Sequence, residues 1–553
     1  AFAMGVCNYL IENNMIDKAF LKKSSTAPCL VRKKDGHILR KSDYGYKPLP
    51  GSTTSIMSDD FAYVWDGAQG KAVPTVESVD PVLTGSFLID NVEYTTTLEL
   101  LIERVSEWTL EHTAEVCDTD QSNIILVAEA LANGPTSVMM GNGAGHYTNS
   151  HTYFTASLAA AILTGNFYKP GAGWANAGVS SDILYYADAS WGEPPNSVAG
   201  PSYSSLDFAD IMKSGEYMGK PAVIKGLITY AGNPVGNVPD RKAFLEALEK
   251  IELFVSVEMS MTDTAEYADI ILPCCHWFEM EDVGGMQYVP YANLGEKAIE
   301  PTFEHKSDFD IVKLLAHALG YGDAFKETAE EVVKICVDKG MMPDIKGGAI
   351  TYERLKQEKN IRTFPDGYYN KTSYLQDARL FFYLENPVPR FAGKKIDVEL
   401  ERLPYFEPPA EAWPHDVGKY KKNVLADKYP LVFQSLHTRF TTHTTYNHVE
   451  WLVELRGGEP SIYLNANDAK VRDIHEGDIV KVFNDRGYVV VKALYDAGLK
   501  PGIVNLPHGW GYDQFREGHY QDLTNRATHA FDGNECYFDC LCEVEKYKGG
   551  GVK

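Results

Sequence analysis

Residues Leu227–Glu281 read LITYAGNPVGNVPDRKAFLEALEKIELFVSVEMSMTDTAEYADIILPCCHWFEME, and this stretch decides the fold. It contains short apolar runs that end in polar breaks, and a segment with apolar residues at helical spacing lies between the first two runs. The runs are Gly226–Tyr230, Leu253–Val257 and Ile270–Leu272, and the helical segment is Arg241–Lys250. Such alternation predicts strands of a parallel sheet joined by crossover helices.

The carboxyl ends of these strands form the first candidate site, because ligands of open parallel sheets bind outside those ends. Gly232-Asn233-Pro234 follows the first strand, and Glu258 to Thr262 follows the second. A glycine lets a ligand approach the backbone, and an acid after a strand can bind ribose hydroxyls. The same residues also suit an ordinary turn with a helix cap, so the spacing alone leaves nucleotide binding open.

Size and charge narrow the class of protein. The 553 residues predict roughly three to four domains at about 150 residues each. The net charge of -24 argues against a nucleic-acid binder, which would carry basic patches. No run of 18 or more apolar residues occurs, so we expect no direct membrane span, and the compartment stays undecided.

The chain opens inside an expected helix, and Ala1–Val6 lacks the basic segment of a signal peptide. We therefore expect it to begin within a larger protein. The nine cysteines are scattered and odd in number, which does not suit a disulfide framework. Cys536, Cys540 and Cys542 form the single cluster; buried thiols are favoured there over a metal site, which needs three or four converging ligands.

Helical and strand patterns divide the chain into three parts. Helices are expected at Phe2–Leu21, Thr95–Cys117, Asn123–Leu131, Tyr153–Leu163 and Phe309–Leu319, and a long loop with strand-like pieces such as Cys29–Arg32 is expected between Ser24 and Gly85. After residue 430 the pattern changes to evenly spaced short β-rich runs separated by turn residues, which indicates a β-barrel. The runs are Val432–Ser435, Ser461–Leu464, Ile479–Asn484, Tyr488–Ala493, Ile503–Leu506 and Cys540–Val544.

We therefore predict an α/β protein with two partial Rossmann-like parallel-sheet domains and a C-terminal β-barrel. The expected ranges are 1–215 for the first α/β domain, 216–415 for the second with a linker, and 425–553 for the barrel. A glycine-rich loop containing Gly141 and Gly143 follows the expected strand Ser137–Met140 and precedes a helix. A helix N-terminus can bind phosphate, although many strand-to-helix turns need glycine for the turn alone.

The densest polar cluster is the loop His437–Thr445, HTRFTTHTT, which follows an expected strand. Its hydroxyls, imidazoles and single guanidinium suit a ligand rich in acceptors and phosphate, and the alternative is a turn rich in threonine. A second segment, Pro507–Gly511, reads PHGWG and lies upstream of Gln521. It suits either recognition of a heterocycle edge or a barrel loop with a packing tryptophan. His276 and Glu279 are interpreted as a surface pair rather than as a metal or acid–base site.

In combination, these motifs resemble the molybdopterin oxidoreductase family of the dimethyl sulfoxide reductase type. The segment Leu163–Gly173, LTGNFYKPGAG, is similar to the family's LTGNxGKPGxG. Gly232-Asn233-Pro234 and Met261–Pro273, MTDTAEYADIILP, are similar to its NP and MTxTAxxADxxLP signatures. Leu464–Ala469, LNANDA, with the later Gly477-Asp478, Arg486-Gly487 and Pro501-Gly502, resembles its C-terminal dinucleotide-binding domain.

The resemblance implies a molybdenum or tungsten ion held by two pyranopterin guanine dinucleotides, with the C-terminal barrel, of the double-psi type, covering both pterins. It also implies cofactor contacts for twelve residues of this chain, and it supplies no catalytic residue and no metal ligand. These residues are Gly141, Gly143, Gly232, Asn233, Glu258, Thr262, Thr438, Arg439, Thr441, His443, Thr444 and Gln521. Gln521 stands where the family usually has asparagine.

The resemblance also implies parts that this sequence does not contain. The cysteine cluster for a 4Fe–4S centre and the residue that ligates the metal are expected upstream of Ala1. The expected partners are a small-molecule substrate and an iron–sulfur electron-transfer subunit. The phrases Thr-Arg-Phe-Thr-Thr-His-Thr and Asn-Asp-Arg-Gly resemble the branch with pyrogallol transhydroxylase and catechol dehydroxylases, which would imply chemistry on an aromatic hydroxyl. The competing hypothesis is a scaffold of the same fold without metal.

Overall fold

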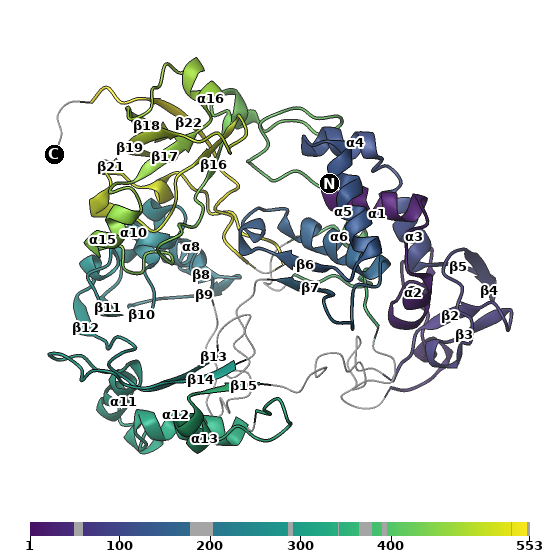
Figure 1. The fold of residues 1–553 in the computed structure, drawn as a ribbon, viewed down its shortest axis with the longest axis horizontal. Coiled ribbons are helices and arrows are strands. Elements are labelled where there is room, and N and C mark those ends of the chain that lie inside the picture. Colours follow the sequence, from purple (N-terminus) through teal and green to yellow (C-terminus); the bar gives the residue numbers. More distant parts are fainter. Residues whose placement is uncertain are drawn as a thin grey trace. The chain divides into compact units, whose positions relative to one another are not determined.

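The computed structural model describes residues 1–48, 59–176, 203–285, 291–340, 342–363, 379–389, 395–531 and 533–549. Its contacts divide the chain into two units, each assembled from three separate segments (Figure 1). Unit 1 consists of Ala1–Ala177, Tyr369–Val432 and Ala527–Leu541, and unit 2 consists of Gly178–Tyr368, Phe433–Arg526 and Cys542–Lys553. The three-part division expected from the sequence stays a prediction.

The parallel sheet predicted from Leu227–Glu281 is present in unit 2. Its strands are β10 (Gly226–Tyr230), β11 (Leu253–Glu258) and β12 (Ile270–Pro273), in the order β10–β11–β12. Both pairings are parallel, with Gly226 opposite Leu253 and Val255 opposite Ile270. The crossover helix α10 (Arg241–Leu248) begins where the Asp240 carboxylate accepts a hydrogen bond from the Ala243 N–H. Its buried Phe244 packs with Phe208 of α8 (Asp207–Ser214).

The C-terminal strands close into a six-stranded barrel, as predicted. The sheet order is β17–β20–β16–β22–β18–β19–β21, and an additional parallel pairing of β17 with β19 closes the ring (Figure 1). Alternate residues face the core, as in β18, where Val480 and Val482 are fully buried. The strands are β16 (Leu431–Gln434), β17 (Ser461–Leu464), β18 (Ile479–Phe483), β19 (Tyr488–Tyr495), β20 (Ile503–Asn505), β21 (Glu517–Gly518) and β22 (Leu541–Lys546).

Two short helices accompany these strands, α15 (Glu450–Leu455) and α16 (Ala466–Val471). Unit 2 also contains an antiparallel sheet that the sequence did not predict, β13–β14–β15, covered by α12 and α13. Its elements and the adjoining helix are β13 (Asp282–Gly285), β14 (Tyr291–Gly295), α11 (Asp308–Ala318), α12 (Ala329–Gly340), α13 (Tyr352–Glu358) and β15 (Asn360–Arg362). The remaining short elements of this unit are β8 (Glu216–Tyr217), β9 (Lys220–Pro221) and α9 (Pro234–Asn237).

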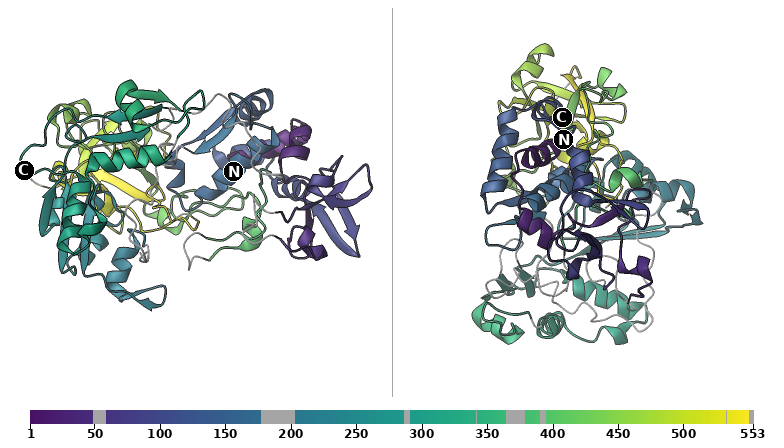
Figure 2. Two further views of the ribbon diagram at one scale, coloured as in Figure 1. Left: turned by 90° about the horizontal axis from the view of Figure 1, so that it is seen from below. Right: turned by 90° about the vertical axis from the view of Figure 1, so that its right-hand side faces the viewer.

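Unit 1 packs a helical core around α1, with α5 and α6 beside it (Figures 1 and 2). The expected single helix Phe2–Leu21 is wrong: α1 (Phe2–Glu12) ends at Asn13, Asn14 adopts a φ of 55°, and α2 (Lys18–Ser24) begins where Asp17 caps Phe20. The expected helix Thr95–Cys117 is likewise two helices, because Thr109 caps the second. The other helices are α3 (Thr97–Val105), α4 (Leu110–Cys117), α5 (Gln121–Asn133), α6 (Ser150–Leu163) and α14 (Val398–Glu401).

The strands of unit 1 are short. The parallel pair β6 (Ser137–Met140) and β7 (Gly173–Asn176) flanks α6, as expected for a partial α/β domain. Much of the expected loop between Ser24 and Gly85 instead forms antiparallel pairs with the residues that follow it. These strands are β1 (Leu30–Arg32), β2 (Tyr63–Asp66), β3 (Lys71–Pro74), β4 (Ser86–Ile89) and β5 (Val92–Thr96). Among the described residues, no helix combines the length and apolar character needed to cross a bilayer.

Candidate functional site

The loop His437–Thr445 follows β16 and carries its polar side chains at or near the surface. His437, Arg439 and His443 are exposed, and His443 adopts a left-handed φ of 52°. The hydroxyls of Thr438 and Thr441 lie 2.7 Å apart and hydrogen-bond each other. In the described part of the chain Arg439 makes no ion pair, and its guanidinium lies 5.7 Å from the Phe440 ring centroid. The loop therefore offers a cation and hydroxyls to a ligand.

His508, from the PHGWG segment, joins two histidines of this loop. One ring nitrogen from each of His437, His443 and His508 lies within 4.8 Å of the others. The His443 and His508 rings stack at 17° with centroids 5.2 Å apart, and the His437 and His508 centroids are 4.3 Å apart. Both segments stand out in the sequence, but their contact was not predicted, because they lie about 70 residues apart.

The hydrogen bonds of His508 define its protonation state. Its Nδ1 lies 2.9 Å from the Ser435 carbonyl oxygen, which can only accept, so Nδ1 carries the proton. Burial, with smaller contributions from His437, His443 and Arg456, lowers the pKa of His508 to about 4. The ring is therefore neutral at pH 7, and Nε2 presents a lone pair. That atom is buried and has no partner among the described residues, so it can accept a hydrogen bond from a ligand or from water.

The end of the parallel sheet reaches the same loop. The Asn233 amide donates to the Thr444 hydroxyl at 3.3 Å, and its oxygen accepts from the Thr264 N–H at 3.0 Å. Asn233 is buried, and Gly232 precedes it in the turn after β10. The structure thus brings Asn233 and Thr444 into contact, with Gly232 next to Asn233 in the turn, and their roles as cofactor contacts stay predictions.

Three further predicted residues lie in unit 2 but serve local contacts. Glu258 ends β11 and accepts from the Met259 N–H at 2.8 Å, and burial raises the pKa of its carboxyl. The Thr262 hydroxyl accepts from the Ala265 N–H at 3.2 Å. Gln521 is buried, and its amide binds the Asn237 carbonyl at 2.9 Å and the Thr524 hydroxyl at 2.7 Å. Their roles as cofactor contacts stay predictions.

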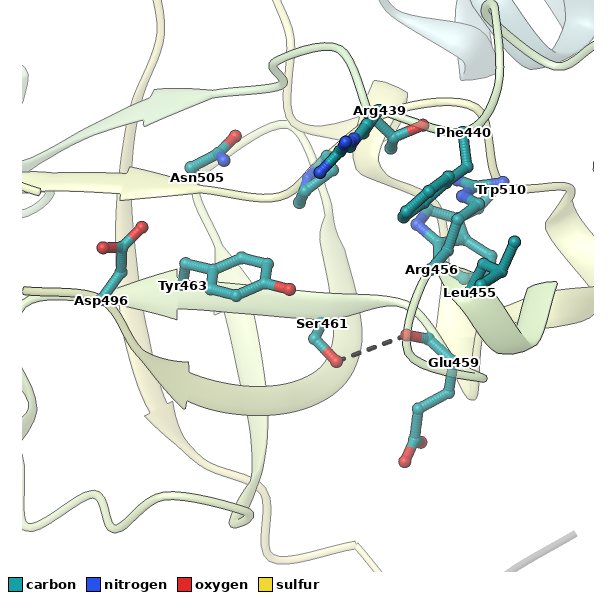
Figure 3. Close-up of a pocket in the computed structure, with 12 residues that line it drawn as sticks. Arg439, Phe440, Leu455, Arg456, Glu459, Ser461, Tyr463, Asp496, Asn505 and Trp510 are labelled. Atoms are coloured by element: carbon teal, nitrogen blue, oxygen red, sulfur yellow. Dashed lines mark hydrogen bonds between the residues drawn. The ribbon is translucent and has the colours of Figure 1, made fainter. Parts of the chain in front are cut away.

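A pocket of about 270 Å³ opens beside the polar loop (Figure 3). Thr438, Arg439 and Phe440 line one side, and Tyr463 and Asn505 project from β17 and β20. The remaining wall contains Leu455, Arg456, Glu459, Ser461, Asp496, Pro507 and Trp510. The sequence did not predict Arg456 and Tyr463 as site residues, because a single arginine after an apolar segment and a tyrosine in a strand belong to no motif.

Gly141 and Gly143 belong to unit 1. A Cβ on Gly141 would meet no atom within 4 Å, so the backbone there is open to a ligand. The C-terminal part of the unit supports the loop: the His146 ring contacts the Glu535 carbonyl at 2.8 Å, and the Thr148 hydroxyl donates to Asp539 at 2.5 Å. Contacts with the C-terminal segment thus support the glycine-rich loop, while Gly141 and Gly143 are exposed and Gly145 is buried.

The other sequence candidates behave as structural groups. The Glu279 carboxylate accepts from the His276 N–H at 2.8 Å and lies 3.2 Å from His305, so it caps a turn. His276 Nε2 lies 2.7 Å from the Tyr446 hydroxyl. Cys536, Cys540 and Cys542 are buried and form no disulfide among the described residues, and no metal-ligand group in those ranges includes them.

Geometry alone defines a class: an α/β protein with a barrel, whose polar loop, guanidinium and buried imidazole acceptor suit a large ligand with both donors and anionic groups. Residues 1–318 match the family model described as "Molybdopterin oxidoreductase", and residues 431–541 match "Molydopterin dinucleotide binding domain". The chain therefore belongs to the molybdopterin oxidoreductase family, whose members are oxidoreductases. The expected molybdopterin dinucleotide cofactor is confirmed by the same matches.

Relatives agree with this assignment. The chain is 29% identical over 554 residues to a Halobacterium salinarum protein named for the catalytic chain of a dimethyl sulfoxide reductase, covering 98% of this chain and 62% of that protein. It is 25% identical to the alpha chain of the dimethylsulfide dehydrogenase of Rhodovulum sulfidophilum, covering 93% of this chain and 63% of that one. The chain thus spans a little over 60% of the length of these relatives.

The fold also resembles a solved structure. Acetylene hydratase from Pelobacter acetylenicus superposes with a TM-score of 0.67 at 16% identity, covering 99% of this chain and 70% of that one. This likeness supports the fold class. Among the described residues, the Nε2 acceptor of His508 has no hydrogen-bond partner and Arg439 has no acid partner, and both fit a cofactor with donors and phosphates.

Proposed function

We propose that this chain is the cofactor-binding part of the catalytic subunit of a molybdenum- or tungsten-dependent oxidoreductase. It binds a bis(molybdopterin guanine dinucleotide), for which unit 2 offers the loop at His437–Thr445 and the turn at Asn233; Gly141 and Gly143 are proposed separately as cofactor contacts. The observation that carries the proposal is the buried Nε2 of His508 beside the donors of that loop. When bound, the cofactor supplies a metal that changes oxidation state as substrate is oxidised or reduced.

The roles of the chain's own residues follow from their chemistry. Arg439 pairs with a cofactor phosphate through charge-assisted hydrogen bonds, because its guanidinium lacks an acid partner among the described residues. One of the Thr438 and Thr441 hydroxyls donates to the other, so the pair has one proton left to donate to a pterin or phosphate oxygen. Asn233 orients Thr444 through the 3.3 Å contact, so the sheet end fixes part of the loop. Glu258, the last residue of β11, binds a ribose hydroxyl.

The substrate and electron partner extend the same proposal. A small molecule is reduced or oxidised, and an iron–sulfur subunit, with a 4Fe–4S centre outside this chain, exchanges electrons. Relatives are named for dimethyl sulfoxide, dimethylsulfide and perchlorate, which are small. The narrower proposal, removal or transfer of an aromatic hydroxyl, rests on the sequence of Thr438–Thr444. Turnover assays with a catechol, a sulfoxide and perchlorate separate these substrate classes.

The experiment compares metal and nucleotide content in the complete enzyme that contains this chain. We expect about one molybdenum or tungsten atom and about two guanine nucleotides per complex. Arg439→Ala should lower both, while the thermal midpoint stays near that of the unsubstituted protein. The matched control is Arg354→Ala, because Arg354 pairs with Asp344 and Glu358 and contacts none of the loop residues.

A scaffold without metal is the competing function. It predicts a folded complex that contains neither metal nor guanine nucleotide, and that result would refute the oxidoreductase proposal. Unchanged cofactor content in Arg439→Ala, with a loaded unsubstituted enzyme, would instead remove only Arg439 from the site. The two results are distinguishable because the first concerns the unsubstituted protein.

A further inference from the structure

Arg456 holds the turn that carries His508. It is the C-cap residue of α15, and its guanidinium donates from Nη1 to the Gly509 carbonyl and from Nη2 to the His508 carbonyl, both at 3.1 Å. The same guanidinium lies 3.7 Å from the Trp510 ring centroid, and Figure 3 shows the two side chains together. One side chain thus contacts three consecutive residues of the turn.

Burying the Arg456 guanidinium costs free energy of folding, which a purely structural contact would not need. Arg456 has no carboxylate partner within the ranges that the structure describes, its Nε is buried without a partner, and burial lowers the pKa of the guanidinium to about 10. Replacing buried charge with apolar side chains often leaves stability unchanged or improves it. An apolar residue could cover Trp510, but only a fork of donors can fix two adjacent carbonyls.

The turn is held from two other sides. Gly509 adopts a φ of 92°, and a Cβ there would lie 2.0 Å from the His443 carbonyl oxygen, so the turn rests directly on the backbone of the polar loop. The His508 N–H donates to the Leu436 carbonyl at 3.1 Å, and its ring donates to Ser435. With Arg456 on its carbonyl, His508 has little freedom to turn, and the direction of its Nε2 lone pair is fixed.

We infer that Arg456 is a positioning residue that aims the His508 lone pair at a donor group of the bound cofactor. The inference rests on the proposed function, since His508 acts only on a ligand. Arg456 acts through the turn whose carbonyls it binds, and its side chain also lines the pocket beside the polar loop. Outer-shell contacts of this kind typically change metal-site affinity or activity by about 10- to 100-fold when they are removed.

The test compares four variants of the complete enzyme. Arg456→Lys keeps the charge but can reach only one carbonyl, and Arg456→Met removes both donors. Gly509→Ala displaces the turn while the arginine at position 456 is kept, because the added Cβ would collide with the His443 carbonyl. The control is Arg472→Lys, since Arg472 is a half-buried fork in the same barrel that binds Glu543 and makes no contact with the turn. Readouts are molybdenum content, thermal midpoint and the electron paramagnetic resonance spectrum of the half-reduced metal.

We expect Arg456→Lys and Gly509→Ala to alter the resonance spectrum in the same direction, and Arg456→Met to retain cofactor about 10-fold less tightly. Arg472→Lys should lower the thermal midpoint at most and leave the spectrum unchanged. Spectra of Arg456→Lys and Gly509→Ala identical to that of the unsubstituted enzyme would overturn the inference, even if Arg456→Met fails to fold. An unsubstituted enzyme without molybdenum would refute the proposed function instead.

Discussion

Asp539 should be among the residues on which unit 1 depends most. Its carboxylate is fully buried and accepts hydrogen bonds from the Thr148 hydroxyl at 2.5 Å and from the N–H groups of Thr148, Ala410, Glu411 and Ala412 at 3.4, 3.0, 2.8 and 2.6 Å. It therefore joins the C-terminal segment and the 410–412 segment to the start of α6. Without it, these backbone donors lose their charged acceptor.

The magnitude follows from those contacts. A hydrogen bond to a charged group contributes about 1.5–3 kcal/mol, and an unsatisfied buried donor costs about 1–3 kcal/mol. Water entry and loop relaxation reduce the sum, so Asp539→Ala should lower the free energy of unfolding by about 3–5 kcal/mol. Asp539→Asn keeps one acceptor oxygen but turns an amide toward the remaining donors, and about 1–3 kcal/mol is expected.

The assay is urea unfolding followed by tryptophan fluorescence, with the control Asp416→Ala. Asp416 is 55% exposed and accepts from the Lys422 N–H at 2.9 Å, so its loss should cost less than about 0.5 kcal/mol. If Asp539→Ala lowers the free energy of unfolding by less than about 1 kcal/mol, the reasoning is refuted, because the donors that Asp539 normally satisfies must then have found other acceptors.

Two further predictions concern other parts of the chain. Burial raises the pKa of Asp522 from 3.8 to about 6, so its ionised form opposes folding and the free energy of unfolding falls as pH rises from about 4 to 6. Asp522→Asn should therefore be more stable than the unsubstituted protein by about 2 kcal/mol at pH 8 and equal to it at pH 4. Thermal unfolding of both proteins at the two pH values measures this difference. In helix α1, a Cβ on Gly5 would lie 2.3 Å from the Thr113 hydroxyl, so Gly5→Ala should lower the free energy of unfolding by about 1–2 kcal/mol although alanine has the better helix propensity. The double variant Gly5→Ala/Thr113→Ala should recover part of this loss. If the effects of the two substitutions on the free energy of unfolding are strictly additive, the clash is excluded.

Local patterns predicted the strands well, because alternation and turn residues act within a few positions. The runs at Ser461–Leu464 and Ser137–Met140 have the bounds expected from the sequence, and the β10–β11–β12 sheet has the predicted order of elements. The helix breaks at Asn14 and Thr109 went unseen, because apolar periodicity continues across them while capping ends the helix. The β13–β14–β15 sheet lacks an alternating pattern long enough to register.

The sequence predicted which types of residue form the candidate site, but it did not predict which of them contact one another. A dense loop of threonine, histidine and arginine is visible in the sequence, but its meeting with His508 depends on the strand order of the barrel. Arg456 is found only through the two carbonyls that it binds. Gln521 shows the opposite case: an amide expected to face the cofactor has both ends engaged by Asn237 and Thr524.

Asp539 and His508 show why buried polar groups in one chain differ in purpose. Asp539 meets donors on both carboxylate oxygens, so its burial stabilises the fold. His508 is half-buried, and its buried Nε2 acceptor is unmet among the described residues; its lowered pKa means that the folded chain loses stability as pH falls from about 6.5 to about 4. A ligand that donates to Nε2 stabilises the neutral ring, so binding and resistance to acid are thermodynamically linked at this residue. Because Nε2 of His508 has no partner among the described residues, a ligand that donates to it explains its burial better than the fold does.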